Sequence, residues 1–230
     1  MEAKSKVLVW DGPTRVFHWT LALSFAGAFL TAESERWRDV HVLLGYTVLA
    51  LVAFRLLWGL FGSRYARFKS FAYGPRDVLG YLKSLVTRGP RHYLGHNPAG
   101  SMVIYALLLL ALATGVSGYL HYNEIGGEWL EKLHETLAYA MLGLVFVHIA
   151  GVVVSSLLHR ENLVSAMVTG YKQGDPANGI RRAHWLVAAL LIGALTALWT
   201  GIVQVPEIST SVQHTADAER GEPDGHMRGP

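Results

Sequence analysis

Five runs of apolar residues, each close to membrane-spanning length, constrain this chain more than any other feature. A helix needs about 20 mostly apolar residues to cross the hydrocarbon core of a membrane. The chain has 51% hydrophobic and only 16% charged residues, which is too apolar for an ordinary soluble domain of 230 residues. We therefore expect an all-α integral membrane helical bundle with five spans, at residues 16–32, 40–61, 99–120, 133–158 and 183–205.

These runs divide the chain into four parts. A short N-terminal segment (1–15) is followed by a four-helix unit (16–172), and then by a linker with a fifth span (173–205). The tail (206–230) is polar and rich in glycine and acidic residues, so we expect it to be disordered. The long loop 62–98 includes "FAYGPRDVLGYLKSLV", a proline-started amphipathic pattern that predicts a helix along the membrane surface.

The distribution of lysine and arginine predicts how the bundle is oriented. Short loops rich in these residues stay on the cytoplasmic side of a membrane. Basic residues gather in the N-terminal segment, in loop 62–98 and in loop 159–182, whereas the alternate loops are acidic or mixed. We therefore expect a cytoplasmic N-terminus and a C-terminus on the outer side. The sequence pI of 9.2 then reflects topology, and a nucleic-acid partner is not expected.

The chain has no cysteine, which excludes several kinds of redox centre. Disulfides, iron–sulfur clusters, thiolate zinc sites and covalently attached c-type haem all need thiols. The chain does have 11 histidines, and five of them fall inside or at the edge of the apolar runs: His18, His41, His134, His148 and His184. Ionisable side chains in a membrane span are costly and usually face a cofactor, a partner or a water-filled path.

The depths of four of these histidines match in pairs. The first span runs outward, so His18 lies near the inner face, and the second runs inward, so His41 lies near the outer face. On the fourth span His134 and His148 are fourteen residues apart, which is close to four turns and about 21 Å. They share one face, so His134 is predicted to oppose His41, and His148 to oppose His18.

Two pairs of facing histidines at two depths are what two stacked bis-histidine haems require. His184 enters the fifth span from the same side as His18, and the spacing favours His18 over His184 as the partner of His148 only modestly. A histidine-based proton or metal transporter is the alternative class. A transporter would need acidic partners at mid-membrane, and the apolar runs contain only Glu135, at the outer edge.

Arg55 is a further candidate site residue. It follows His41 by fourteen residues, so it lies on nearly the same face of the second span at the depth of the inner histidine pair. A guanidinium there could bind a haem propionate. The competing interpretation is that Arg55 extends to the membrane surface, about two turns away.

The residues around these histidines resemble the bacterial cytochrome b561 family, which includes the b-type cytochrome subunits of nickel–iron hydrogenases and of respiratory formate dehydrogenase. The resemblance covers about residues 7–172. It rests on four stretches: "VWDGPTRVFHW", "HVLLGYTVLALVAFRLLWGLFGSRYARF", "RHYLGHNPAG" and "LHETLAYAMLGLVFVHIAGVV". It implies a four-helix core with two b haems, the cytoplasmic-side haem on His18 and His148 and the periplasmic-side haem on His41 and His134. The core of that family does not need a fifth helix, which favours His18 over His184.

The resemblance also implies a function. We expect a multi-pass protein of the bacterial inner membrane that transfers electrons between the quinone pool and a periplasmic-side partner, namely a hydrogenase, a dehydrogenase or a c-type cytochrome. An electron-transfer subunit is favoured over a stand-alone enzyme. The alternative within haem chemistry is an oxidoreductase that reacts alone with superoxide or ferric iron at the outer haem.

Overall fold

The computed structural model describes residues 5–87 and 91–203, which form seven α-helices, three short 3₁₀ helices and two short strands. The strands are β1 (Ser5–Leu8) and β2 (Tyr171–Gly174). The 3₁₀ helices are η1 (Glu35–Trp37), η2 (Phe68–Phe71) and η3 (Pro176–Asn178). The α-helices are α1 (Gly12–Thr31), α2 (Arg38–Phe61), α3 (Pro75–Val86), α4 (Pro98–Tyr122), α5 (Glu128–His159), α6 (Leu163–Thr169) and α7 (Trp185–Trp199).

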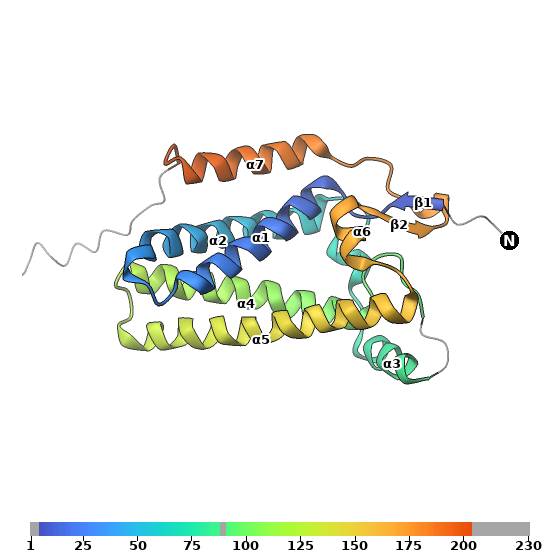
Figure 1. The fold of residues 1–230 in the computed structure, drawn as a ribbon, viewed down its shortest axis with the longest axis horizontal. Coiled ribbons are helices and arrows are strands. Elements are labelled where there is room, and N and C mark those ends of the chain that lie inside the picture. The colour runs from blue at the N-terminus through green and yellow to red at the C-terminus, as the bar shows by residue number, and fades with distance from the viewer. Residues whose placement is uncertain (1–4, 88–90, 204–230) are drawn as a thin grey trace, which may run out of the picture.

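Four long helices, α1, α2, α4 and α5, lie side by side and run alternately in opposite directions (Figure 1). The helix α1 packs on α2, α2 packs on α4, and α4 packs on α5. The core between them is apolar, with Leu51, Val52 and Ala111 fully buried. The helix α7 lies on the outside of this group, against α1 and α2. The predicted helical bundle is therefore present.

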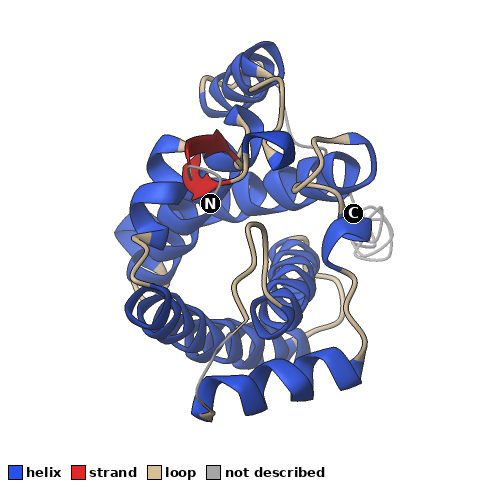
Figure 2. Ribbon diagram, turned by 90° about the vertical axis from the view of Figure 1, so that its right-hand side faces the viewer, coloured by secondary structure: helices blue, strands red, loops and turns tan. Residues whose placement is uncertain are grey.

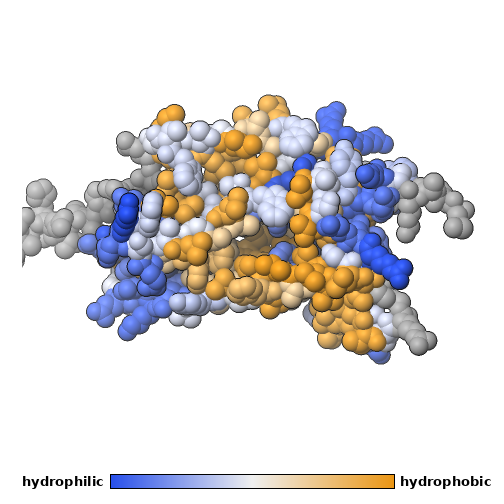
Figure 3. All heavy atoms as spheres, viewed as in Figure 1, coloured by the Kyte–Doolittle hydropathy of each residue, from blue (hydrophilic) through white to orange (hydrophobic). Residues whose placement is uncertain are grey.

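Within residues 5–87 and 91–203, three helices are long and apolar enough to cross a membrane: residues Glu35–Phe61, Pro98–Tyr122 and Glu128–His159. The helix α1, with 20 residues, is about 30 Å long. Large apolar side chains on these helices, such as Leu23, Leu109 and Phe146, are more than half exposed. Figure 3 shows an apolar middle between two hydrophilic ends. Such a surface is suited to lipid and not to water.

The fifth apolar run forms a shorter helix than its sequence predicts. The helix α7 has 15 residues, so it extends about 22 Å, less than the roughly 30 Å hydrocarbon core. The predicted span begins two residues earlier, at 183, and continues to 205, beyond the described residues. A complete fifth crossing stays a prediction, and the predicted disordered tail lies outside the described residues.

The all-α prediction was wrong at one point, because the structure has a two-stranded antiparallel sheet (red in Figure 2). The strand β1 pairs with β2 in a register that matches Ser5 with Gly174 and Leu8 with Tyr171. Val7, Val9 and Trp10 are buried beside it, against Ala166. A four-residue strand leaves no clear period in the sequence, and its partner lies far away along the chain.

The three basic segments meet at one end of the bundle, which we call the basic end. The N-terminal segment and the segment after α6 are joined by the sheet. Tyr65, in the long loop, donates a hydrogen bond to the carbonyl of Asn178 at 2.8 Å. Lys172 donates to the carbonyl of Tyr93 at 3.2 Å and forms an ion pair with Glu161 at 3.0 Å. The helix α3, predicted in the long loop, lies crosswise to the long helices at this end (Figure 2).

Polar caps extend two helices beyond the apolar runs that predict them. The first span was predicted from residue 16, but Asp11 accepts a hydrogen bond from the backbone N–H of Thr14 and starts α1 at Gly12. Asn97 does the same for α4 by accepting from the N–H of Gly100. Proline occupies the first turn of each helix, where its missing N–H is not needed. The first of these caps fixes the start of the helix that carries His18.

Candidate functional site

Four half-buried histidines face one another in two pairs at different depths of the bundle. His18 on α1 and His148 on α5 form the inner pair, with ring centroids 6.4 Å apart. His41 on α2 and His134 on α5 form the outer pair, with ring centroids 6.1 Å apart. The structure thus brings together the histidines that the fourteen-residue spacing matches by depth.

The ring separations have a simple chemical meaning. Two imidazoles that bind one metal ion from opposite sides each make a bond of about 2 Å. With the two ring radii added, their centroids lie about 6 Å apart. Both pairs have this separation, so each leaves room for one metal ion between its rings.

The outer pair is also oriented for ligation. The Nδ1 atom of His41 lies 2.8 Å from the carbonyl oxygen of Ala28, and that of His134 lies 2.9 Å from the carbonyl oxygen of Thr114. A carbonyl only accepts, so Nδ1 carries the proton in each ring and donates it. Each Nε2 then keeps its lone pair for a metal. Such a hydrogen bond on the far nitrogen is the usual support of a metal-binding histidine.

A glycine on α4 makes room for the outer pair. If Gly118 carried a Cβ atom, that atom would lie 2.7 Å from Cε1 and 2.9 Å from Nδ1 of His134. Contacts this short do not occur without movement, so the imidazole of His134 needs the missing side chain. None of the described glycines is constrained in this way by the inner pair, where the rings of Trp19 and His18 pack in a T-shaped arrangement with centroids 5.0 Å apart.

Arg55 lies near the basic end of α2 and is 3% exposed. The interpretation in which it extends to the membrane surface was therefore wrong. Its guanidinium carbon lies 4.8 Å from the ring centroid of Phe68 and 5.9 Å from that of Phe71. Its Nη1 atom is buried without a hydrogen-bond partner, and no carboxylate of the described residues forms an ion pair with it. A buried cation of this kind is suited to an anionic group of a ligand.

His96, just before α4, belongs to the same region although its sequence position in a loop predicts a solvated side chain. Its ring packs between Trp10, at 4.7 Å, and Phe71, at 4.4 Å between centroids. Burial, with a smaller effect of the nearby Arg55 charge, lowers the pKa of His96 to about 3. The ring is therefore neutral at physiological pH. Nothing in the loop composition distinguishes His96 from the exposed His92.

Asp11 is a second residue that the sequence pattern did not single out. Its side chain is fully buried at the start of α1. Besides capping the helix, it accepts a hydrogen bond from Nε1 of Trp58 at 3.0 Å. It thereby ties the start of α1 to α2. The signal for this role was the pattern Asp-Gly-Pro before an apolar run, which is typical of a helix start.

His184, the alternative partner for His148, lies elsewhere. It precedes α7 in a left-handed backbone conformation, with φ at +53°. Its ring packs edge-on against Trp58, 5.4 Å away between centroids. The ring opposite His148 in the inner pair belongs to His18. The two similar stretches around His18 and His184 therefore lead to different surroundings.

The described residues contain no cluster of three or more histidine, aspartate or glutamate side chains that could hold a metal ion alone. A pair of histidines supplies only two ligands. The donor set fits a metal whose other ligands come from a planar macrocycle, as in a six-coordinate haem.

Comparison with known proteins supplies an independent line of evidence. Residues 9–170 match the model of a family described as prokaryotic cytochrome b561. This range contains both histidine pairs, Arg55 and His96. No solved structure matches the chain.

Several curated relatives carry the name of probable Ni/Fe-hydrogenase B-type cytochrome subunit. The protein from Bradyrhizobium diazoefficiens is 24% identical, with 73% of this chain and 86% of the relative covered. The protein from Azotobacter vinelandii is 25% identical, with 74% and 89% covered. The Escherichia coli K12 relative, named as the hydrogenase 1 subunit, is 20% identical, with 71% and 89% covered. From the family match, which spans most of its length, the chain belongs to the prokaryotic cytochrome b561 family.

Proposed function

We propose that this protein is a membrane cytochrome that holds two b haems and transfers electrons between the quinone pool and a redox partner. The observation that carries the proposal is the pair of imidazole separations, 6.4 and 6.1 Å, at two depths of one bundle. The hydrogen bonds from both Nδ1 atoms of the outer pair to backbone carbonyls support it. Membership of a cytochrome b561 family agrees with b haem as the cofactor.

Each residue has a defined part in this proposal. His18 and His148 bind the iron of the inner haem, and His41 and His134 bind that of the outer haem. Arg55, which is buried and forms no ion pair within the described residues, neutralises a propionate of the inner haem. Haem iron supplies reversible one-electron chemistry, while the protein supplies axial ligands, a dry setting and spacing.

The spacing of the two levels suits transfer across a membrane. His134 and His148 are about 21 Å apart along α5, which is most of the roughly 30 Å hydrocarbon core. Two electron-carrying sites at these depths connect the regions near the two faces. A single pair would leave most of that distance without a carrier.

The partner is inferred from the relatives, which are named as hydrogenase B-type cytochrome subunits. We propose that a hydrogenase, another dehydrogenase or a c-type cytochrome docks on the outer, periplasmic side of the inner membrane. The basic end then faces the cytoplasm. Quinone or quinol is the exchange partner within the membrane.

The proposal is tested on the full-length chain, purified from membranes in a mild detergent. Pyridine haemochrome analysis is expected to find two b haems per chain, and a redox titration is expected to resolve two one-electron steps. A short-chain quinol should reduce at least one of them. A chain that folds in the membrane but carries no haem would contradict the proposal and favour the transporter alternative.

The space at Gly118 provides a second prediction. We expect Gly118→Ala to lower the haem content from two towards one per chain, because the added methyl group displaces the His134 imidazole. Gly193→Ala on α7 is the matched control, since a Cβ there meets no atom of the described residues within 4 Å. Equal haem content in the two variants, measured by pyridine haemochrome, would show that His134 does not need this space.

A further inference from the structure

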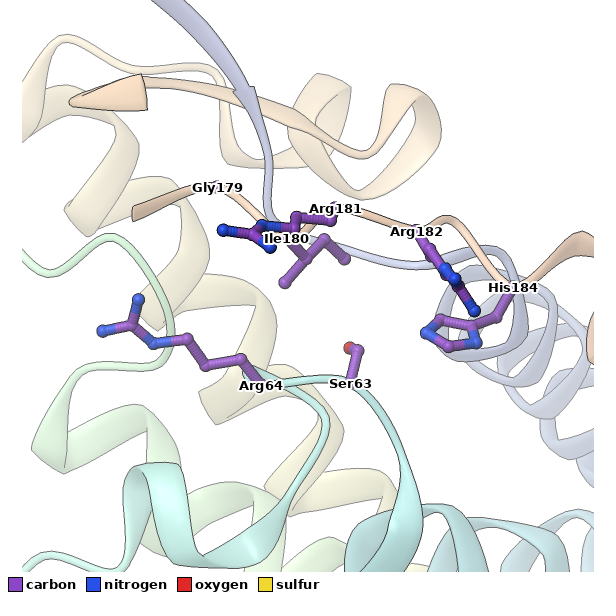
Figure 4. Close-up of a pocket in the computed structure, with 7 residues that line it drawn as sticks. All are labelled: Ser63, Arg64, Gly179, Ile180, Arg181, Arg182 and His184. Atoms are coloured by element: carbon purple, nitrogen blue, oxygen red, sulfur yellow. The ribbon is translucent and has the colours of Figure 1, made fainter. Parts of the chain in front are cut away.

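An open pocket of about 330 Å³ lies at the basic end, away from both histidine pairs (Figure 4). One wall is the turn after α2, with Ser63 and Arg64. The other wall is the segment before α7, with Arg181, Arg182 and His184. None of these residues belongs to either proposed haem site.

The pocket has an excess of positive charge. Arg64, Arg181 and Arg182 are exposed, and within residues 5–87 and 91–203 none of them forms an ion pair with a carboxylate. Among the described residues Arg64 donates to the side-chain oxygen of Asn178 at 3.4 Å, and its guanidinium carbon lies 5.4 Å from the ring centroid of Tyr65; both groups are neutral. Three guanidinium groups around one hollow attract an anion, and their planar donor geometry suits a phosphate.

A buried hydroxyl points into this pocket. Ser63 is 8% exposed, and its buried Oγ atom has no hydrogen-bond partner among the residues that the structure describes. Figure 4 shows this oxygen directed into the space between the two walls. Buried hydroxyls in native proteins are nearly always paired. An anionic oxygen in the pocket would accept the hydrogen bond that Ser63 does not otherwise make.

The start of α7 adds to the positive electrostatic potential of the pocket. The helix begins at Trp185, and no side chain of the described part of the chain caps its first turn. The N-terminal end of a helix carries a partial positive charge and unpaired N–H groups, which favour an anion. His184, at the cap position, lines the pocket. Arginines, an unpaired hydroxyl and a helix start thus line one pocket.

Apolar surface continues directly from both walls. Phe61, two residues before Ser63, is 79% exposed, and Trp185 and Leu186, which follow His184, are 57% and 75% exposed. These side chains lie where the apolar belt of the helices begins. A free phosphate would leave them uncovered, whereas acyl chains attached to a phosphate would cover them.

We propose that this pocket binds the phosphate head group of an anionic membrane lipid, with its acyl chains along the ends of α2 and α7. Basic pockets between membrane helices are the known sites of such recognition. The bound lipid joins α7 to the four-helix bundle at its basic end. The proposal does not depend on haem binding.

The test uses the full haem-loaded chain, delipidated in detergent and examined by native mass spectrometry. Phosphatidylglycerol is the probe, phosphatidylcholine with the same chains is the neutral comparison, and inorganic phosphate is the third arm. We expect one phosphatidylglycerol per chain to be retained, little phosphatidylcholine, and no displacement by millimolar phosphate. Equal retention of the two lipids, or full displacement by phosphate, would overturn the proposal; these comparisons need no variant.

The variants locate the site. Arg181→Gln with Arg182→Gln is expected to weaken phosphatidylglycerol binding roughly 30-fold, because each basic residue contributes a factor of about five and the two factors multiply. Ser63→Ala should weaken it further. Arg36→Gln with Arg38→Gln, at the opposite end of the bundle, is the matched control and should bind as wild type. Unchanged lipid binding in the Arg181→Gln, Arg182→Gln variant would contradict the proposed lipid site. Loss of haem absorbance from the same variant would also contradict it, because these arginines would then belong to the haem site.

Discussion

Replacing His148 with alanine is expected to remove one of the two haems, so that the haem content falls from two to one per chain. Each iron in the proposed sites depends on two imidazoles, and alanine offers no replacement ligand. His18→Ala should remove the same haem, because the two rings face each other across 6.4 Å. His41→Ala and His134→Ala should each remove the other haem, so that only the absorbance of the inner haem remains.

Pyridine haemochrome analysis and redox titration of the purified variants measure this effect. The double variant His18→Ala with His148→Ala should lose no more haem than either single variant, because both act on one site. His184→Ala is the matched control: it shares the basic-residue, histidine, tryptophan sequence pattern with His18 but packs against Trp58. Loss of the inner haem in His184→Ala, with retention in His18→Ala, would overturn the proposed pairing.

Replacing Arg55 with leucine is expected to lower the midpoint potential of the inner haem by roughly 50–100 mV, as expected for one nearby charge partly screened by the protein. A positive charge disfavours the ferric state, which carries one more positive charge than the ferrous state. Its removal therefore favours oxidation and lowers the potential. Arg55 is 3% exposed, so water screens its charge only weakly.

A potentiometric titration separates this effect from a general loss of structure. The outer haem should keep its potential, and Arg55→Lys, which keeps the charge, should shift the inner potential much less than Arg55→Leu. An equal shift of both haems, or none, would show that Arg55 does not act on the inner site. The comparison of leucine with lysine also distinguishes charge from packing against Phe68.

Much of the bundle follows from the sequence because the membrane restricts the possible structures. A run of about 20 apolar residues in lipid must satisfy its own backbone hydrogen bonds, which a helix does within the segment. The spans around His41, Leu108 and His148 were predicted for this reason, and the structure has helices there. The ends were predicted less well, because polar caps such as Asp11 and Asn97 lie outside the apolar runs.

The matching of histidines by depth also follows from the sequence. Fourteen residues are close to four helical turns, so His134 and His148 had to share a face of α5, and alternating directions set the depths of His18 and His41. Sequence periodicity could not decide between His18 and His184. That choice depends on which helix passes beside α5, and the structure places the ring of His18 there.

The sequence alone determined where the four long helices lie and that they alternate in direction, because these features depend on local period and hydrophobic length. Only the tertiary structure decided which side chains from distant segments lie next to one another. Helix packing sets the distance across each histidine pair, and it buries Arg55 and His96. It also pairs β1 with β2. Finally, it brings Ser63 into one pocket with Arg181 and Arg182. These contacts join segments far apart in the chain, so they depend on how the helices pack and not on any local pattern.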